Sequence, residues 1–183
     1  MYKSPSRDCL LIFDVVERLM KDKVIIDHIK HALYDVAFLD IKRASSGNSK
    51  TGAFILASCF IDYMAGFICG QKTTPTDYKN FVRCYLPAIY EPTKLYADLR
   101  CKLVHNYSEG GTYWLKHGQP QLHGQVVGSR TVINLENFLD DLEHAFYKVM
   151  NDIQHDPSLR ARAINRYNSI GLLCVAGIAV GKT

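Results

Sequence analysis

The sequence lacks the long apolar run that a membrane-spanning helix requires. Its longest apolar stretch, Ile170 to Val180, has 11 residues, whereas a spanning helix needs about 20. The first residues also lack the apolar run that follows the charges of an export signal. These absences predict a cytoplasmic protein with no membrane contact, in which residues 170–183 form an apolar C-terminal tail that is buried or faces a partner.

Motifs for covalent catalysis are missing as well. The six cysteines include no C-x-x-C pair, and no serine or cysteine lies in a G-x-S-x-G or C-G-x-C-W type element. A hydrolase with a covalent nucleophile is therefore not expected. We expect the cysteines, two of which lie in the most apolar stretch of the chain, to be reduced residues of the core.

Signals for cofactors and metals are weak. Residues 177–183, GIAVGKT, have three residues between the glycines, where a phosphate loop needs four. His28 and His31 are three residues apart on a predicted helix, but a metal site needs three or four convergent ligands. His117 and His123 flank a predicted turn, and nothing nearby completes a site. The sequence therefore predicts no cofactor and no metal.

The overall composition is that of one globular domain. The 183 residues are 48% hydrophobic and 22% charged, which predicts a single compact domain over residues 1–183 and excludes a disordered or low-complexity chain. The formal net charge of +4 permits binding to RNA without requiring it.

Apolar residues recur at three- and four-residue steps in several segments, which predicts amphipathic helices. The helices are expected at residues 24–44, 50–70, 74–84, 92–107 and 135–153, followed by a basic last segment after Asp156. Residues 112–133 instead alternate aromatic and polar side chains around two glycine breaks, as in a hairpin or meander. The expected fold class is mainly α, an up-and-down helical bundle with a small β-hairpin insertion around residues 112–133.

The helix expected at residues 50–70 is apolar on nearly every side, so it belongs at the centre of the bundle. Asp62 is the only charged residue between Thr51 and Gly70. A carboxylate in such a helix costs several kcal/mol unless it is paired or hydrogen-bonded. We therefore expect Asp62 to reach a hydrogen-bond donor or to face a cleft.

The segment LRCKLVHNY places Arg100 and His105 five positions apart near the end of a helix, followed by Asn106 and Tyr107. This R-x4-H pattern resembles the HEPN family, the nucleotide-binding domain of higher eukaryotes and prokaryotes. The resemblance extends over about residues 25–153, because the apolar helix with one acid and the later amphipathic helix also match that family's bundle.

The resemblance implies a metal-independent ribonuclease that acts as a toxin or defence effector. Arg100 and His105 would be catalytic, and Asp62, Lys102, Asn106 and Tyr107 would support them. By the same resemblance, Arg100 is the donor that we expect Asp62 to reach. The implied partners are RNA or a nucleotide, a second copy of the chain in a homodimer with the cleft at its interface, and a separate antitoxin or other partner protein.

Residue chemistry makes this activity intelligible. Cleavage of RNA by its own 2′-hydroxyl needs a base, an acid and positive charge on the phosphorane. His105 suits either proton-transfer role, and Arg100 suits the third. Positions five apart on a regular α-helix point about 140° away from each other. Both side chains therefore reach one atom only if the arginine bends round, if the helix ends near Asn106, or if two chains share one cleft.

Two alternatives remain open. The position after the arginine is usually polar in active family members, and here it is Cys101, which favours a catalytically silent bundle that binds RNA, a nucleotide or a protein. In a purely structural interpretation, Arg100 pairs with Asp98 or Asp62, and His105 caps the C-terminal end of its helix.

Overall fold

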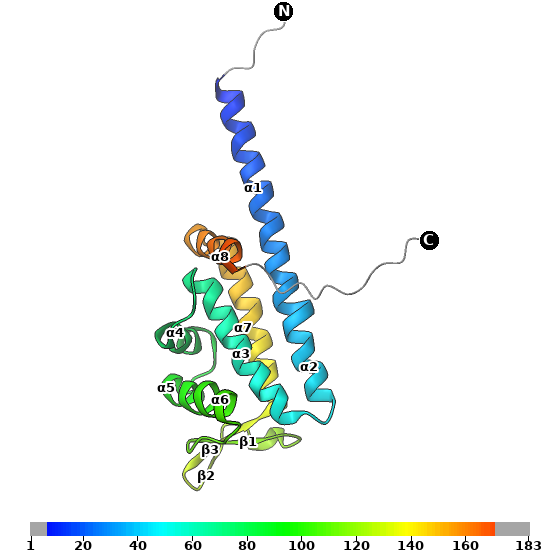
Figure 1. Ribbon diagram of the computed structural model, residues 1–183, viewed down its shortest axis with the longest axis vertical. Helices are drawn as coiled ribbons and strands as arrows, with labels where there is room; N and C mark the ends of the chain where they lie inside the picture. Colours follow the sequence, from blue (N-terminus) through cyan, green and yellow to red (C-terminus); the bar gives the residue numbers. More distant parts are fainter. Residues whose placement is uncertain (1–6, 171–183) are drawn as a thin grey trace, which may run out of the picture.

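Three long helical rods lie side by side in the computed structural model, which describes residues 7–170 (Figure 1). The first rod has no break, although it contains a π-helical segment; it consists of α1 (Arg7–His31), η1 (Ala32–Phe38) and α2 (Leu39–Ser46). The other two rods are α3 (Lys50–Cys69) and α7 (Leu135–His155). The first rod therefore begins well before the predicted residue 24, and the N-terminal half of α1 projects beyond the rest of the bundle.

Helix α3 is the core helix that its composition predicts. Ala57, Ile61, Met64 and Phe67 of this helix are fully buried. Among the described residues, α3 is the one helix whose length and composition would allow it to cross a membrane, so the expectation that no segment meets those two criteria is wrong. The most apolar stretch of α3 is 56% buried inside the structure, which also fits the core helix of a folded bundle.

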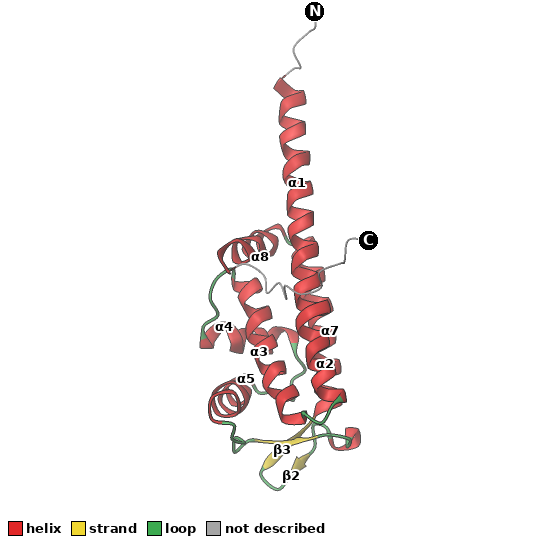
Figure 2. Cartoon of the chain, turned by 45° about the vertical axis from the view of Figure 1, so that its right-hand side comes forward, coloured by secondary structure: helices red, strands yellow, loops and turns green. Residues whose placement is uncertain are grey.

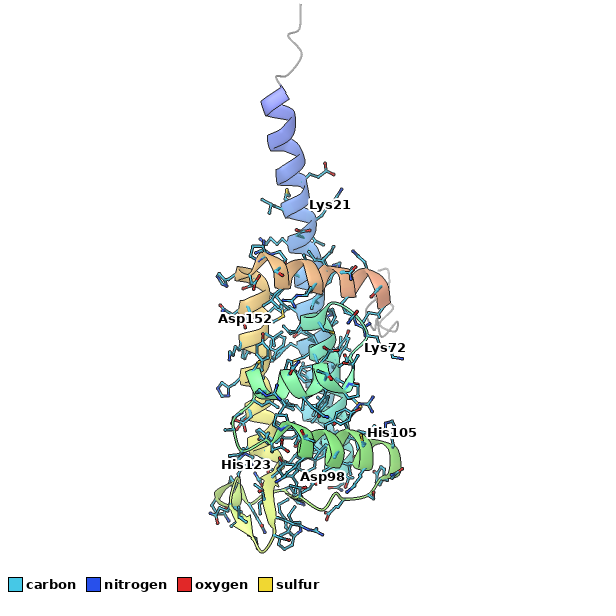
Figure 3. All side chains as sticks on the ribbon, turned by 90° about the vertical axis from the view of Figure 1, so that its left-hand side faces the viewer. Lys21, Lys72, Asp98, His105, His123 and Asp152 are labelled. Atoms are coloured by element: carbon cyan, nitrogen blue, oxygen red, sulfur yellow. The ribbon has the colours of Figure 1, made fainter. Side chains whose placement is uncertain are left out.

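Shorter helices cross the rods on one side (Figure 2). Helix α4 (Pro75–Tyr85) begins with a capping box between Thr74 and Asp77, close to the predicted start. Helix α8 (Pro157–Ile170) packs across the ends of α3 and α7 (Figure 3). The Asp156 carboxylate accepts hydrogen bonds from the first amides of α8. Side chains from all these helices meet in one hydrophobic core.

The helix that carries Arg100 and His105 has three parts. It begins as α5 (Pro92–Leu95), widens into the π-helical segment η2 (Tyr96–Leu103) and ends as α6 (Val104–Asn106). The Glu91 carboxylate accepts hydrogen bonds from two amides of the first turn, at 3.1 and 2.7 Å. The predicted bounds of this helix are confirmed to within one residue, but its π-helical middle was not predicted.

A small three-stranded sheet closes the lower end of the bundle. The strands are β1 (Tyr113–Lys116), β2 (Val126–Val127) and β3 (Arg130–Asn134), in the order β1-β3-β2. The predicted hairpin is confirmed for β2 and β3, which pair antiparallel around the turn at Gly128. A meander is wrong, because β1 pairs parallel with β3. The 117–129 connection, which includes η3 (Pro120–Leu122), provides the length that parallel pairing requires.

His123 anchors this sheet to the helices and does not meet His117 across a turn. Its Nδ1 accepts a hydrogen bond from the Asn134 amide at 3.1 Å, and its Nε2 lies 3.1 Å from the Tyr90 hydroxyl. The same hydroxyl donates to Asp141 of α7 at 2.6 Å. This half-buried chain of polar contacts explains how the sheet stays attached to the bundle.

The prediction that the cysteines are core residues is wrong for part of the set. Cys59 and Cys84 are exposed, and Cys69 and Cys101 are half-buried. All four are free thiols. Cys59 belongs to the most apolar stretch of the chain but is exposed, where it lines a surface cavity between α3 and the first rod.

Gly110 provides a test of the loop that follows the Arg100 helix. A Cβ at this position would lie 1.8–2.2 Å from the carboxylate atoms of Asp98. Asp98 is buried and accepts hydrogen bonds from the Thr112 and Tyr113 amides. We expect Gly110→Ala to lower the free energy of unfolding by about 3 kcal/mol, because it displaces a buried hydrogen-bonded carboxylate.

Gly111→Ala is the matched control, because no atom lies within 4 Å of the Cβ that it adds. Urea denaturation of both variants measures the difference. Equal stability of the two variants would contradict the structural role assigned to the buried Asp98 carboxylate.

Candidate active site: an arginine–histidine pair held by a core carboxylate

The predicted contact between Asp62 and Arg100 is confirmed. The Arg100 Nε donates to Asp62 Oδ2 at 3.0 Å, and the two side chains are 25% and 26% exposed. Asp98, the other acid considered for Arg100, instead faces the amides that follow Gly111. Asp62, the one charged residue between Thr51 and Gly70, therefore holds the Arg100 guanidinium at a position that is partly open to solvent.

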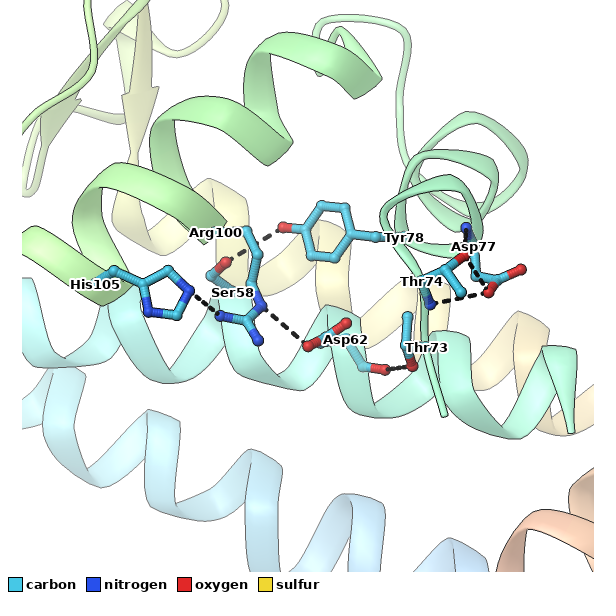
Figure 4. A network of polar contacts seen from close by, with 8 residues as sticks. All are labelled: Ser58, Asp62, Thr73, Thr74, Asp77, Tyr78, Arg100 and His105. Atoms are coloured by element: carbon cyan, nitrogen blue, oxygen red, sulfur yellow. Dashed lines mark hydrogen bonds and ion pairs between the residues drawn. The ribbon is translucent and has the colours of Figure 1, made fainter. Parts of the chain in front are cut away.

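Further polar contacts hold α3 in place around this acid (Figure 4). The Thr73 hydroxyl donates to the Asp62 carbonyl at 2.8 Å, and the Ser58 and Tyr78 hydroxyls lie 3.3 Å apart in the buried layer beneath Arg100. The sequence analysis missed these residues. Ser58 could have been found, because it lies four residues before Asp62 and so on the same face of the helix.

Arg100 and His105 of one chain touch each other, with the Arg100 Nη1 3.2 Å from the His105 Nε2. The π-helical segment explains the contact. In such a segment each amide bonds to the carbonyl five residues earlier, as the Val104 amide does to the Leu99 carbonyl, so residues five apart diverge less than on a regular α-helix. The divergence expected for a regular α-helix is therefore wrong here.

This contact defines the tautomer of the imidazole. An arginine N–H can only donate, so the Nε2 of His105 accepts and the neutral ring carries its proton on Nδ1. The ring is exposed to solvent. The site therefore presents one imidazole lone pair, directed at a guanidinium, on the surface of the bundle.

The helix ends at Asn106, one residue after His105, as one of the expected geometries required. Tyr107 adopts a left-handed conformation with φ 54° and ψ 30°. The Tyr107 and Ser108 amides bond to the Leu103 and Lys102 carbonyls, at 3.0 and 3.4 Å. Backbone groups thus satisfy the helix end, and the His105 side chain contacts Arg100 instead of acting as the proposed C-terminal cap.

Electrostatics favour a permanently charged guanidinium. Partial burial works against the charged form of Arg100, but the charge and hydrogen bond of Asp62 outweigh it and raise the arginine pKa. The neighbouring Cys59 has a raised pKa because burial disfavours its thiolate, although Arg100 acts in the opposite direction. Cys59 is therefore a protonated thiol at neutral pH and a poor nucleophile.

The other predicted site residues lie around the pair without joining its hydrogen bonds. Lys102 is exposed, and its Nζ lies 3.7 Å from the Asp98 carboxylate. Asn106 is exposed at the last position of α6. Tyr107 is 69% exposed and lines a small cavity beside the motif. The structure therefore brings together Asp62, Arg100 and His105 and places the remaining three around them.

The histidines considered for metal binding have separate contacts. The His28 Nδ1 lies 3.2 Å from the Tyr167 hydroxyl, and the His31 Nδ1 lies 2.8 Å from Asp35. Within residues 7–170, no group of three or more His, Cys, Asp or Glu side chains is placed to hold a metal. Residues 177–183, whose glycine spacing does not fit a phosphate loop, lie outside the described residues.

Known proteins give no further guide to this site. No protein-family model, curated protein or solved structure matches the chain. The interpretation of the site depends on its own chemistry and on the R-x4-H resemblance of Arg100 and His105.

Proposed function

We propose that this chain is a HEPN-like ribonuclease that cleaves RNA without a metal, by attack of the 2′-hydroxyl on the adjacent phosphate. The observation that carries the proposal is the hydrogen-bonded series Asp62–Arg100–His105, in which a core carboxylate holds a guanidinium against an exposed imidazole. This series combines a fixed positive charge with an imidazole, a side chain that can accept or donate a proton.

In this mechanism Arg100 binds the scissile phosphate. A guanidinium has five N–H donors, and the contacts with Asp62 and His105 use one on Nε and one on Nη1. The other three donors, two on Nη2 and the second on Nη1, bind phosphate oxygens first, and the phosphate then also takes the Nη1 hydrogen bond from His105. The guanidinium so placed stabilises the charge of the phosphorane. Asp62 touches no reacting atom and is a positioning residue.

His105 acts as the base. A phosphate bound to Arg100 replaces the imidazole as acceptor of the Nη1 hydrogen bond, which releases the Nε2 lone pair. The freed Nε2 takes the proton of the 2′-hydroxyl, the new bond from O2′ to phosphorus forms, and the bond to O5′ breaks. The departing O5′ takes a proton from a second acid, and the products are a 2′,3′-cyclic phosphate and a 5′-hydroxyl.

A second chain supplies that acid in this proposal. One imidazole cannot accept and donate the two protons at the same moment, so the cleft holds His105 of each of two chains related by a two-fold axis. We expect a homodimer of about twice 20.7 kDa, with the Arg100 helix at its interface. Light scattering at tens of micromolar checks this, and a strict monomer there would contradict the shared cleft.

The proposed biological setting follows the same resemblance. The chain would act in the cytoplasm as a toxin or defence effector controlled by an antitoxin or other partner protein. A catalytically silent bundle that binds RNA, a nucleotide or a protein is the second candidate. Cys101, which follows the arginine and is half-buried, favours it, because active family members usually have a polar residue there.

One experiment separates these functions. The purified full-length chain is incubated in excess EDTA with an RNA oligonucleotide and with the same oligonucleotide carrying 2′-deoxy residues throughout. We expect cleavage of the RNA alone, because the attacking group is the 2′-hydroxyl. Binding to the RNA without cleavage, unchanged in Arg100→Ala and His105→Ala variants, would make the silent bundle the better account.

A further inference from the structure

A small cavity lies beside the Arg100–His105 pair. It encloses about 250 Å³, below the roughly 300–1,000 Å³ of pockets for drug-sized ligands. Its wall joins the start of α3, the end of the Arg100 helix and strand β1, through Lys50, Phe54, Leu103, Tyr107, Leu115 and Lys116. Phe54 and Leu103 are buried, so the cavity has an apolar floor and room for one flat ring.

Tyr107 is an unusual residue for its place on the rim of this cavity. Within residues 7–170, it is the one non-glycine residue with a positive φ. A side chain in this conformation costs about 1–2 kcal/mol, and glycine or asparagine normally occupies such a helix end. Its ring is nevertheless 69% exposed. The fold thus presents an aromatic face to solvent at a position where that side chain is unfavourable.

Positive charge flanks the cavity. Lys50 donates a hydrogen bond to the Ser45 carbonyl, and Lys116 is held with its Nζ 3.8 Å from the centroid of the Trp114 ring. Glu109 is the acidic residue of the wall, and Arg130 offsets it with an N–O distance of 3.4 Å. An anion at the mouth of the cavity would replace the Ser45 carbonyl or the Trp114 ring as the partner of an ammonium group.

An apolar floor, an exposed aromatic ring and two cations together match a nucleobase with its phosphates. The cavity is too small for a whole nucleotide, so the base enters and the phosphates stay outside on the lysines. We infer that this cavity binds one nucleobase of the RNA substrate, stacked on Tyr107, next to the phosphate that Arg100 holds.

The inference rests on the proposed ribonuclease function and adds a subsite to it. Tyr107 follows His105 by two residues, so their Cα atoms are at most about 7.6 Å apart. One RNA strand can therefore contact both. The cavity is made within one chain, so base binding does not require the dimer.

Tyr107→Asn tests the stacking. Asparagine removes the ring but suits the left-handed conformation, so the variant keeps or gains thermal stability. Binding is measured by fluorescence anisotropy with a labelled 2′-O-methyl oligonucleotide, which cannot be cleaved. We expect the Kd to rise roughly 5- to 150-fold, the effect of losing one stacked base.

Two variants serve as controls for that measurement. Tyr107→Phe keeps the ring and should bind like the wild type. Tyr147→Asn removes an exposed tyrosine of α7, which contacts Tyr34, and should also leave the Kd unchanged. Unchanged binding in Tyr107→Asn would overturn the inference, and so would an equal loss in Tyr107→Phe, because the ring would then not be the contact.

Lys50→Gln and Lys116→Gln test the phosphate contacts. Each should lower the dependence of log Kd on log salt by about 0.7, the value for one contact to a single strand. Lys72→Gln, beyond the other end of the 20-residue helix α3, is the control and should leave the slope unchanged. Slopes that match the wild type in both test variants would overturn the assignment of the lysines.

The outcomes separate this subsite from the ribonuclease itself. If the wild type cleaves RNA and Tyr107→Asn binds RNA as tightly as the wild type, the base subsite is wrong and the ribonuclease proposal stands. Tyr107-dependent binding by a chain that cleaves no RNA supports the base pocket and removes the catalysis. No binding and no cleavage would overturn both.

Discussion

His105→Ala should lower RNA cleavage by about 10²- to 10⁴-fold, the usual cost of losing a general acid or base. The imidazole is exposed and makes one hydrogen bond, to Arg100, so its removal leaves no unpaired buried group. The melting temperature should therefore stay close to that of the wild type. Initial rates on a labelled RNA, together with a thermal melt, measure both quantities.

His144→Ala is the matched control for this variant. His144 is also exposed, and its Nδ1 lies 2.8 Å from a carbonyl of its own helix, that of Asp140. It should cleave RNA at the wild-type rate. If His105→Ala and His144→Ala lower the cleavage rate equally, the loss does not depend on the position of the histidine. The role of His105 as a base would then be wrong.

Arg100→Lys should lower the cleavage rate by about 10²- to 10³-fold, as expected for loss of preorganised charge at the transition state. Lysine keeps the charge beside Asp62, so the half-buried carboxylate remains paired and the fold is retained. An ammonium cannot contact Asp62 and His105 while also offering a planar pair of donors to phosphate. The comparison with Arg100→Ala then separates charge from geometry.

The Arg100→Lys/His105→Ala double variant tests whether the two residues act as a unit. When two residues act together, their losses of cleavage rate do not add as free energies. The double variant should therefore cleave RNA only slightly more slowly than the less active of the two single variants. Single-turnover rates give the values. Losses that multiply fully would indicate two independent roles and would contradict the hydrogen-bonded series described above. If Arg100→Lys cleaves RNA as fast as the wild type, a planar pair of N–H donors is not needed, and the role assigned to the guanidinium would be wrong.

The sequence was sufficient to predict the contact that matters most in this account. An acid alone in an apolar helix needs a donor, and the resemblance of the R-x4-H segment named Arg100, 38 positions away, as that donor. Helix starts marked by local chemistry were also predictable, as at Thr74 and Asp77. A helix start of this kind depends on a few neighbouring residues, so it can be predicted without knowledge of the fold.

Other features depended on the whole fold. The contact between Arg100 and His105 arises from the π-helical turn of η2, and no residue pattern distinguishes that wider turn from a regular helix. The parallel pairing of β1 with β3 is a long-range choice that the alternating residues of 112–133 do not specify. The cavity beneath Tyr107 likewise needs α3 and β1 in place before it exists.

The central claim is that Arg100 and His105 cleave RNA through the 2′-hydroxyl, and the ends of the cleaved RNA test it most directly. Wild type and His105→Ala are purified side by side, and their products in excess EDTA are identified by mass spectrometry. The account predicts 2′,3′-cyclic phosphate and 5′-hydroxyl ends from the wild type, and about 10²- to 10⁴-fold less of them from the variant. Ends with a 3′-hydroxyl and a 5′-phosphate, a requirement for Mg²⁺, or equal cleavage by His105→Ala would contradict it.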